Sequence, residues 1–386
     1  MYEEYKSEIF PKSDIQARWS KARALMAKFN LGALLITNEQ NLVYFAGTEP
    51  PFCYSRPYLL IIPRDSDPIL VVHRIAKEQQ ERISWVSDIR LHEELQTPVK
   101  LVSEIFHELH IDQDKIGTEL GKDQRLFISY NDFESIRKSI PQSEFVDASD
   151  IILNMRAIKS EAEAQAHRVA CKITTAAHES VGSLLKQGMT ARELGSLLQR
   201  KLAEEGGYSP FVYVRNGKDM LPPMGASLFP TRNPNATLRE GLLLVDMGVC
   251  WQGYWSDFSR HYWIGPVPKV AYEINQAEAD AVNAGVEAVK PGNPIGDVYR
   301  ASMNALKEHR IDMSGKMGRI GHGLGLSPCE KPDVLPTTEE IQRGMVFTLE
   351  PWIASEFGWF AIEQDMLVTP SGCEVLSLAP TDLINV

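Results

Sequence analysis

Two segments in the C-terminal half of this 386-residue chain each hold a pair of acidic residues on either side of a glycine, and these pairs constrain the fold most. Asp246 and Asp257 form the first pair, in VDMGVCWQGYWSDFSR, and Glu350 and Glu363 form the second, in TLEPWIASEFGWFAIEQD. The apolar and aromatic residues between the acids indicate strands joined by short turns. Because like charges opposite each other destabilise a sheet, two such pairs in one fold predict a bound cation.

The expected turns bring the acids of each pair together. The midpoint of the first pair falls at Trp251–Gln252 and that of the second at Glu356–Phe357, each next to a glycine. With a turn there, the two acids of a pair lie opposite each other, with Cβ atoms about 4.5–5.5 Å apart. His322, in GHGLGLSPCEKP, adds an imidazole. Any one of these acids alone would ordinarily be a solvated loop residue, but the set of five suits two divalent ions about 3.5–4 Å apart.

The N-terminal part reads as an α/β domain. Short apolar runs bounded by Gly, Pro, Asn or Asp predict strands at 33–37, 58–63 and 68–73. Helical spacing is present around 15–29, 75–82 and 99–110. The character of the sequence changes near residue 155, so the predicted domains are 1–155 and 156–386.

The second part begins with two predicted helices. The first places one apolar stripe on a single face and ends near Gly188; the stripe is Val169, Ile173, Ala177, Val181 and Leu184. A capping-box pattern, Thr190 to Glu193, opens the second helix. Its buried stripe is expected to be Leu194, Leu197, Leu198 and Leu202.

This arrangement recurs further along the chain. Gly188 and Gly292 are 104 residues apart, and so are Asp246 and Glu350. We interpret the second part as two copies of a helix–helix–hairpin unit that face each other, with the acids at the seam.

Composition limits the partners. A net charge of −11 argues against nucleic acid and against an anionic membrane surface. The five cysteines include no CxxC pair, so a disulfide framework is not expected. Neither a signal peptide nor an apolar run long enough to span a bilayer is evident, which predicts a cytoplasmic protein without membrane contact.

Together these motifs resemble the creatinase/prolidase/aminopeptidase P group, the pita-bread metallopeptidases. NEQNLVYFAG resembles the creatinase-type N-terminal domain and RAIKSEAE its connection to the catalytic domain. The resemblance implies an α/β (α+β) fold, with a creatinase-like N-terminal domain and a pita-bread domain of internal pseudo-twofold symmetry. It implies two divalent ions that activate a bridging water. It also implies that the protein is a homodimer. The implied metal ligands are Asp246, Asp257, His322, Glu350 and Glu363, with Glu350 as the general base and His322 also at the catalytic centre.

Three positions depart from the proline-specific members of that group. A histidine expected seven residues after Gly217 is Met224, one expected seven after His322 is Cys329, and an arginine expected two before Glu363 is Ala361. In the family these residues bind the substrate and stabilise the tetrahedral intermediate, so their absence suggests a changed substrate pocket.

Other pocket candidates rest on weaker signals. Cys329 is interpreted either as a space-filling residue or as a nucleophile with a lowered pKa. His261 follows the second aspartate closely and is a candidate contact to the metal site. Phe52, Tyr54 and Arg56 lie on an N-terminal loop that reaches the partner subunit's site in the family, and ordinary loop surface is the alternative.

The leading prediction is a metal-dependent hydrolase of the Xaa-Pro dipeptidase or aminopeptidase type, acting on a short peptide or another small molecule. Mn²⁺ suits a carboxylate-rich site best, with Zn, Co or Fe as alternatives. A rival prediction is a non-peptidase relative that acts on a small amide, amidine or zwitterion as a creatinase-like hydrolase or lyase. An inactive scaffold is disfavoured because the ligand set is complete and the sequence shows no charged tail.

Overall fold

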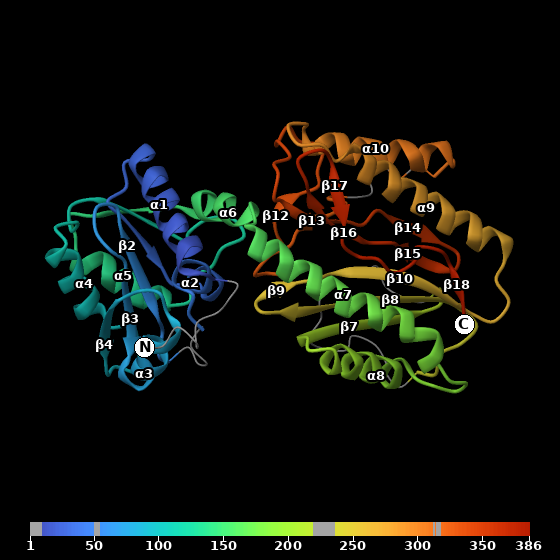
Figure 1. The fold of residues 1–386 in the computed structure, drawn as a ribbon, viewed down its shortest axis with the longest axis horizontal. Coiled ribbons are helices and arrows are strands. Elements are labelled where there is room, and N and C mark those ends of the chain that lie inside the picture. The colour runs from blue at the N-terminus through green and yellow to red at the C-terminus, as the bar shows by residue number, and fades with distance from the viewer. Residues whose placement is uncertain (1–9, 50–54, 219–235, 312, 314–317) are drawn as a thin grey trace. The chain divides into compact units, whose positions relative to one another are not determined.

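The computed structural model of the chain describes residues 10–49, 55–218, 236–311, 313 and 318–386. The chain divides into two compact units, Met1–Arg156 and Ala157–Val386. Figure 1 shows both units and labels their elements.

The first unit contains a six-stranded mixed sheet in the order β4-β3-β2-β1-β5-β6. Its strands are β1 (Ala33–Ile36), β2 (Leu59–Pro63), β3 (Ile69–His73), β4 (Asp88–His92), β5 (Lys115–Thr118) and β6 (Glu144–Asp147). Its helices are α1 (Lys12–Lys28), α2 (Glu39–Ala46), α3 (Lys77–Ile83), α4 (Val99–Glu108), α5 (Tyr130–Ser139) and α6 (Ser149–Ala157). The three predicted strands and three predicted helices are therefore present, with ends shifted by a few residues.

The first unit buries both faces of its central strands, which explains why their sequences are continuous apolar runs rather than alternating ones. Every residue of β1 and β2 is buried. Helices α4 and α5 pack on one face, where Phe106 and Ile136 meet Leu35 and Ile61. Helices α1 and α2 lie on the other side of β2 (Figure 1).

The second unit is built from two similar halves, seen in Figure 1 as two helix pairs with sheets between them. The first half contains α7 (Glu161–Leu184), α8 (Ala191–Glu204), β7 (Tyr208–Asn216), β8 (Gly241–Trp251), β9 (Tyr254–Trp255) and β10 (Phe258–Ile264). The second contains α9 (Lys269–Ala288), α10 (Ile295–Glu308), β11 (His322–Gly323), β12 (Glu330–Asp333), β13 (Val346–Leu349), β14 (Trp352–Ser355), β15 (Gly358–Ala361), β16 (Gln364–Val368) and β17 (Cys373–Val375). Strand β18 (Ile384–Asn385) returns to pair with β10.

Local signals explain where these helices begin and end. The predicted capping box at Thr190 is present, because its hydroxyl accepts from the Glu193 amide and the Glu193 carboxylate accepts from the Thr190 amide. Ser160 opens α7 with a second capping box. The turns before α8 and α10 each contain a glycine with positive φ, 81° at Gly188 and 87° at Gly292, as the repeat predicts.

Strand β8 joins the two halves because both of its faces are buried. Val245, Met247 and Val249 pack against α7 and α8. Leu242 and Leu244 belong instead to the core formed with α9 and α10. Since side chains alternate along a strand, Asp246 shares the face that points to the second half.

Among the described residues, no helix combines the length and the apolar character that crossing a membrane would require.

Candidate metal centre

The first acidic pair lies on a hairpin whose turn is one residue later than predicted. Gln252 and Gly253 form the turn, with positive φ of 49° and 92°. Trp251 therefore pairs with Tyr254, and Asp246 pairs with Ser259 rather than with Asp257. The predicted direct opposition of Asp246 and Asp257 is thus wrong by two residues. The two acids still share one face of the ribbon as diagonal neighbours, since side chains two residues apart point the same way.

Asp257 follows β9 in a stretch without regular strand geometry, and a buried acid holds it in place. Its backbone N–H donates to Asp365 Oδ2 over 3.0 Å. The Cys171 thiol donates to the same oxygen over 3.3 Å. Asp365 is fully buried and two residues beyond Glu363, so it connects the first hairpin to the second. Sequence reasoning missed Asp365, because an acid inside a strand carries no motif of its own.

The second acidic pair has the predicted geometry. Trp352 pairs with Ala361 on one side of an interruption in the ribbon, and Leu349 pairs with Gln364 on the other. This common register places Glu350 and Glu363 opposite each other across the interruption. The turn lies at residues 356–357, as expected.

Three consecutive residues of β10 hold the backbone next to Glu363. The Ser259 hydroxyl donates to the Ala361 carbonyl, and the Glu363 amide donates to the Ser259 carbonyl over 3.3 Å. The Arg260 guanidinium donates to the Glu363 carbonyl over 2.6 Å. The Ala361 amide donates to His261 Nε2 over 2.7 Å. The strand that follows Asp257 thereby fixes the position of Glu363, which couples the positions of the two acidic pairs.

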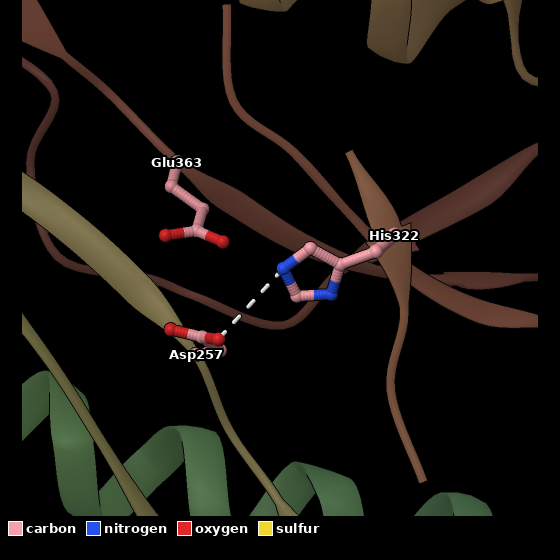
Figure 2. A group of neighbouring side chains, drawn as sticks. All are labelled: Asp257, His322 and Glu363. Atoms are coloured by element: carbon pink, nitrogen blue, oxygen red, sulfur yellow. Dashed lines mark ion pairs between the residues drawn. The ribbon is translucent and has the colours of Figure 1, made fainter. Parts of the chain in front are cut away.

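His322 reaches the carboxylates from β11. Its Nε2 atom lies 3.4 Å from Glu350 Oε1 and 3.9 Å from Asp257 Oδ2. Figure 2 shows the imidazole facing the carboxylates of Asp257 and Glu363, and one ligand atom from each of these three side chains lies within 4.8 Å of the others. Burial lowers the pKa of His322 to about 4, so its imidazole is neutral at physiological pH, as metal ligation requires.

The carboxylates of the centre are held in an unfavourable electrostatic state without a cation. Burial raises the pKa of Asp246 to about 6. Burial, followed by the charge of Asp246, raises the pKa of Glu350 to about 7. The pKa values of Asp257 and Glu363 are also well above the ordinary range, through burial first and then the neighbouring acids. Each shift is a cost of holding the ionised form in the folded protein.

The donor set fits divalent metal ions. Asp246 Oδ1 and Glu363 Oε1 are buried and have no hydrogen-bond partner among the described residues. Buried polar atoms ordinarily have a partner, so these two oxygens are suited to coordinate a cation. Hard carboxylate oxygens with one neutral imidazole match the preferences of Mn²⁺ and related ions.

Two further residues at the centre carried no signal in the sequence. The Trp352 indole N–H donates to Glu350 Oε2 over 3.1 Å and so orients that carboxylate. The positive charge of Arg319 partly offsets the burial-driven rise in the pKa of Glu350 and adds to the burial-driven fall in the pKa of His322, which indicates that its guanidinium lies near both. Trp352 is only two residues from Glu350, whereas Arg319 is brought beside Glu350 by the backbone hydrogen bond between Ile320 and Glu350.

The pocket candidates have different outcomes. Met224, Phe52 and Tyr54 lie outside the described residues. Arg56 belongs to the first unit and is half-buried there. Ala361 is buried, and its backbone amide donates a hydrogen bond to His261. His261 therefore contacts the segment that carries Glu363 through the backbone of Ala361. Cys329 is exposed, which disfavours its interpretation as a space-filling core residue.

A buried carboxylate centre at the seam of two similar half-domains is typical of metallohydrolases. Comparison with known families agrees with that class. Residues 165–370, more than half of the chain, match the model of metallopeptidase family M24, and residues 18–158 match the creatinase/prolidase N-terminal domain. The chain therefore belongs to metallopeptidase family M24, in the creatinase/prolidase/aminopeptidase P group, and is a peptidase-type hydrolase with a creatinase-like N-terminal domain and a pita-bread C-terminal domain.

Individual relatives extend over nearly the whole chain. A putative dipeptidase of Bacillus subtilis, YkvY, is 29% identical over 364 residues, which are 91% of this chain and 95% of that protein. Among solved structures, the prolidase from Pyrococcus horikoshii is 25% identical with a TM-score of 0.81 and covers 95% of this chain and 100% of its own. The Xaa-Pro dipeptidase from Bacillus anthracis is 23% identical, with a TM-score of 0.83 over 96% of this chain and 100% of its own, and supports the fold.

Proposed function

We propose that the chain is a dinuclear-metal peptidase that cleaves the amide bond before proline in short peptides, as an Xaa-Pro dipeptidase or aminopeptidase. The observation that carries this proposal is the buried ligand set: four carboxylates with raised pKa values around one neutral imidazole. The names of two similar proteins, a putative dipeptidase and a prolidase, favour a short peptide substrate.

Two divalent ions would be held by the five predicted ligands: Asp246, Asp257, His322, Glu350 and Glu363. When bound, such ions polarise a carbonyl and lower the pKa of water, which supplies a nucleophile at neutral pH. Manganese is our first assignment, with Zn, Co or Fe as alternatives. We assign residues 156–386 to the catalytic domain and residues 1–155 to the creatinase-type domain. The homodimer and the cytoplasmic location expected from the sequence stay predictions.

Glu350 is our choice for the general base. Its Oε2 atom accepts from the Trp352 indole, which holds the carboxylate in one orientation. Burial, followed by the charge of Asp246, raises the pKa of Glu350 to about 7, and a general base works best when its pKa is close to the operating pH. Glu350 would take a proton from the attacking water and return it to the leaving amine. His322 would stay neutral and act as a ligand.

The alternative substrate class, a small non-peptide amide, amidine or zwitterion, is favoured by the departures at positions 329 and 361. Exposed position 329 carries a thiol and buried position 361 carries a methyl group. The proline-specific members have hydrogen-bond donors, a histidine and an arginine, at these two positions. Removing one donor to a developing oxyanion typically costs about 10²–10³ in rate.

The test is hydrolysis of Xaa-Pro dipeptides and longer Xaa-Pro peptides by protein reconstituted with Mn²⁺, with metal content measured in the same sample. We expect two ions per chain, proline-specific cleavage and its loss on chelation. Glu350→Gln should lower kcat by at least about 100-fold, the usual minimum for loss of a general base. A protein that holds two ions and cleaves none of these peptides would transfer the proposal to the non-peptide class.

A further inference from the structure

Arg319 occupies a position that the backbone fixes against the metal centre. It lies three residues before His322, in a short segment tied on both sides. The Glu350 amide donates to the Ile320 carbonyl over 2.8 Å, and the Ile320 amide donates to the Val334 carbonyl over 3.0 Å. Arg319 is therefore adjacent to the strand that delivers Glu350 and to the end of β12.

The two terminal nitrogens of the Arg319 guanidinium have acceptors of different strength, a carboxylate and a sulfur. Its Nη1 atom donates to Asp333 Oδ1 over 2.8 Å, and Asp333 is the register partner of His322. Its Nη2 atom donates to Cys329 Sγ over 3.0 Å. The Arg319 side chain is 40% exposed, so solvent and small molecules reach it. Sulfur is a weak acceptor, and a carboxylate would replace it readily because a charge-assisted hydrogen bond is about twice as strong as a neutral one.

The residues around Arg319 explain why a positively charged side chain is important beside the acidic centre. The ligands of the centre are acidic, and they would repel a substrate that carries its own carboxylate. Position 361, on the ribbon that carries Glu363, offers only a buried methyl group. Arg215 is a second guanidinium nearby, but its charge acts on Asp246 from β7, on the opposite ligand pair.

We propose that Arg319, anchored by Asp333 and presented beside the Cys329 sulfur, is a carboxylate-binding subsite, so that the substrate is a small amide with its own free carboxylate. For a peptide substrate this means an unmodified dipeptide rather than a longer chain. This inference rests on the proposed hydrolase function for its kinetic consequence, but the subsite itself can be tested without activity.

The direct test uses Cys329 as the reporter. Iodoacetate and iodoacetamide both alkylate a thiolate with loss of iodide, and they differ in that iodoacetate carries a carboxylate. We expect the ratio of the iodoacetate rate to the iodoacetamide rate at Cys329, measured by mass spectrometry of the peptide that contains it, to fall about 10- to 100-fold in Arg319→Met, the range expected for loss of a hydrogen-bonded charge pair. Any effect of Arg319 on thiol reactivity acts on both reagents and cancels in the ratio.

Matched variants separate the possible causes. Arg319→Lys keeps the charge and should retain part of the preference for iodoacetate. Arg300→Met removes an exposed arginine that also pairs with an acid, Asp297, and should leave the ratio unchanged. An unchanged ratio in Arg319→Met, or an equal fall in Arg215→Met, would overturn the assignment.

The kinetic arm compares Ala-Pro with Ala-Pro-amide in the Mn²⁺-loaded enzyme. We expect Arg319→Met to raise KM for the free acid and to change that for the amide little. Equal turnover of the two by the wild type would contradict the subsite while supporting the peptidase. Cleavage of neither would contradict the proposed function, and the alkylation ratio would still decide the subsite.

Discussion

At the scale of single residues, His261 shows how a hydrogen-bond network fixes the backbone next to Glu363, one of the proposed metal ligands. The Ala361 amide donates to Nε2, so the ring hydrogen is on Nδ1, which donates to Asn275 Oδ1 over 2.7 Å. Asn275 in turn donates to the Thr381 carbonyl over 3.0 Å. Burial lowers the pKa of His261 to about 4, which keeps the ring in this neutral form. The network holds the residue two before Glu363.

His261→Ala should weaken metal binding as well as the fold. The substitution leaves the buried Ala361 amide and the Asn275 side chain without their partner, at a cost of about 1–3 kcal/mol for each group. We expect metal affinity to fall about 10- to 100-fold, as is usual when a residue that orients a ligand is removed. Titration calorimetry with Mn²⁺ and urea denaturation would measure the two effects.

His309→Ala is the control for that variant. His309 lies in the same unit, is exposed and pairs with Asp280, so its removal should change stability by less than about 0.5 kcal/mol. An affinity for Mn²⁺ that stays at the wild-type level in His261→Ala would show that Glu363 is positioned without this network.

At the scale of elements, the short strand β11, which carries the proposed ligand His322, is held in place by close backbone contact. A Cβ atom on Gly323 would lie 1.9 Å from the Lys331 carbonyl oxygen, because β12 passes directly against it. The register shifts between His322 and Gly323, which lets the strand turn the imidazole toward the carboxylates. A two-residue strand could not keep this position through its own hydrogen bonds alone.

Gly323→Ala should therefore displace β12 and move His322. We expect a loss of about 1–3 kcal/mol in the free energy of unfolding, as for an overpacked site, together with weaker Mn²⁺ binding. Gly195→Ala is the matched control, since Gly195 is inside α8 and a Cβ there would meet Val214 at an ordinary 3.8 Å. The control should gain about 0.5–1 kcal/mol through lower backbone entropy in the unfolded chain. Equal stability of the two variants in urea denaturation would contradict the close-contact argument.

At the scale of the whole molecule, the buried carboxylates of the proposed metal centre link the free energy of unfolding to pH. The carboxyl group of Glu350 has a pKa raised to about 7 in the metal-free protein, against an ordinary value of 4.5. A group whose pKa is raised on folding contributes stability below its unfolded pKa and loses that contribution as the pH rises through the folded value. Metal-free protein should therefore lose this contribution between about pH 4.5 and pH 8.

Bound Mn²⁺ takes the place of the protons, so its stabilising effect should grow with pH. We expect the difference in the free energy of unfolding between Mn²⁺-loaded and chelated protein to increase from pH 6.5 to pH 8, on the order of 1 kcal/mol from Glu350 alone. The buried His167 and His178, whose pKa values burial lowers to about 3, contribute equally with and without metal and cancel in the difference. A difference that is constant or falls with pH would mean that the carboxylates are not the metal ligands.

The pattern of residues along the chain was enough to predict the two-part organisation, the repeat in the second part and the turn between Glu350 and Glu363, because these depend on local turn, capping and burial preferences. The register of the first hairpin was wrong by two residues, because the prediction centred the turn on Trp251–Gln252. The two-residue turn has positive φ at both central positions, Gln252 and Gly253, a conformation that favours glycine at the second position. The contact of Asp365 with Asp257 and the place of Arg319 beside Glu350 could not be predicted, because they join segments that are far apart in the sequence. The hydrogen bond from Trp352 to Glu350 spans only two residues, but no sequence motif signals it. Local turn and strand preferences thus determined which segments present the acidic residues. Tertiary packing decided which other side chains contact those acids.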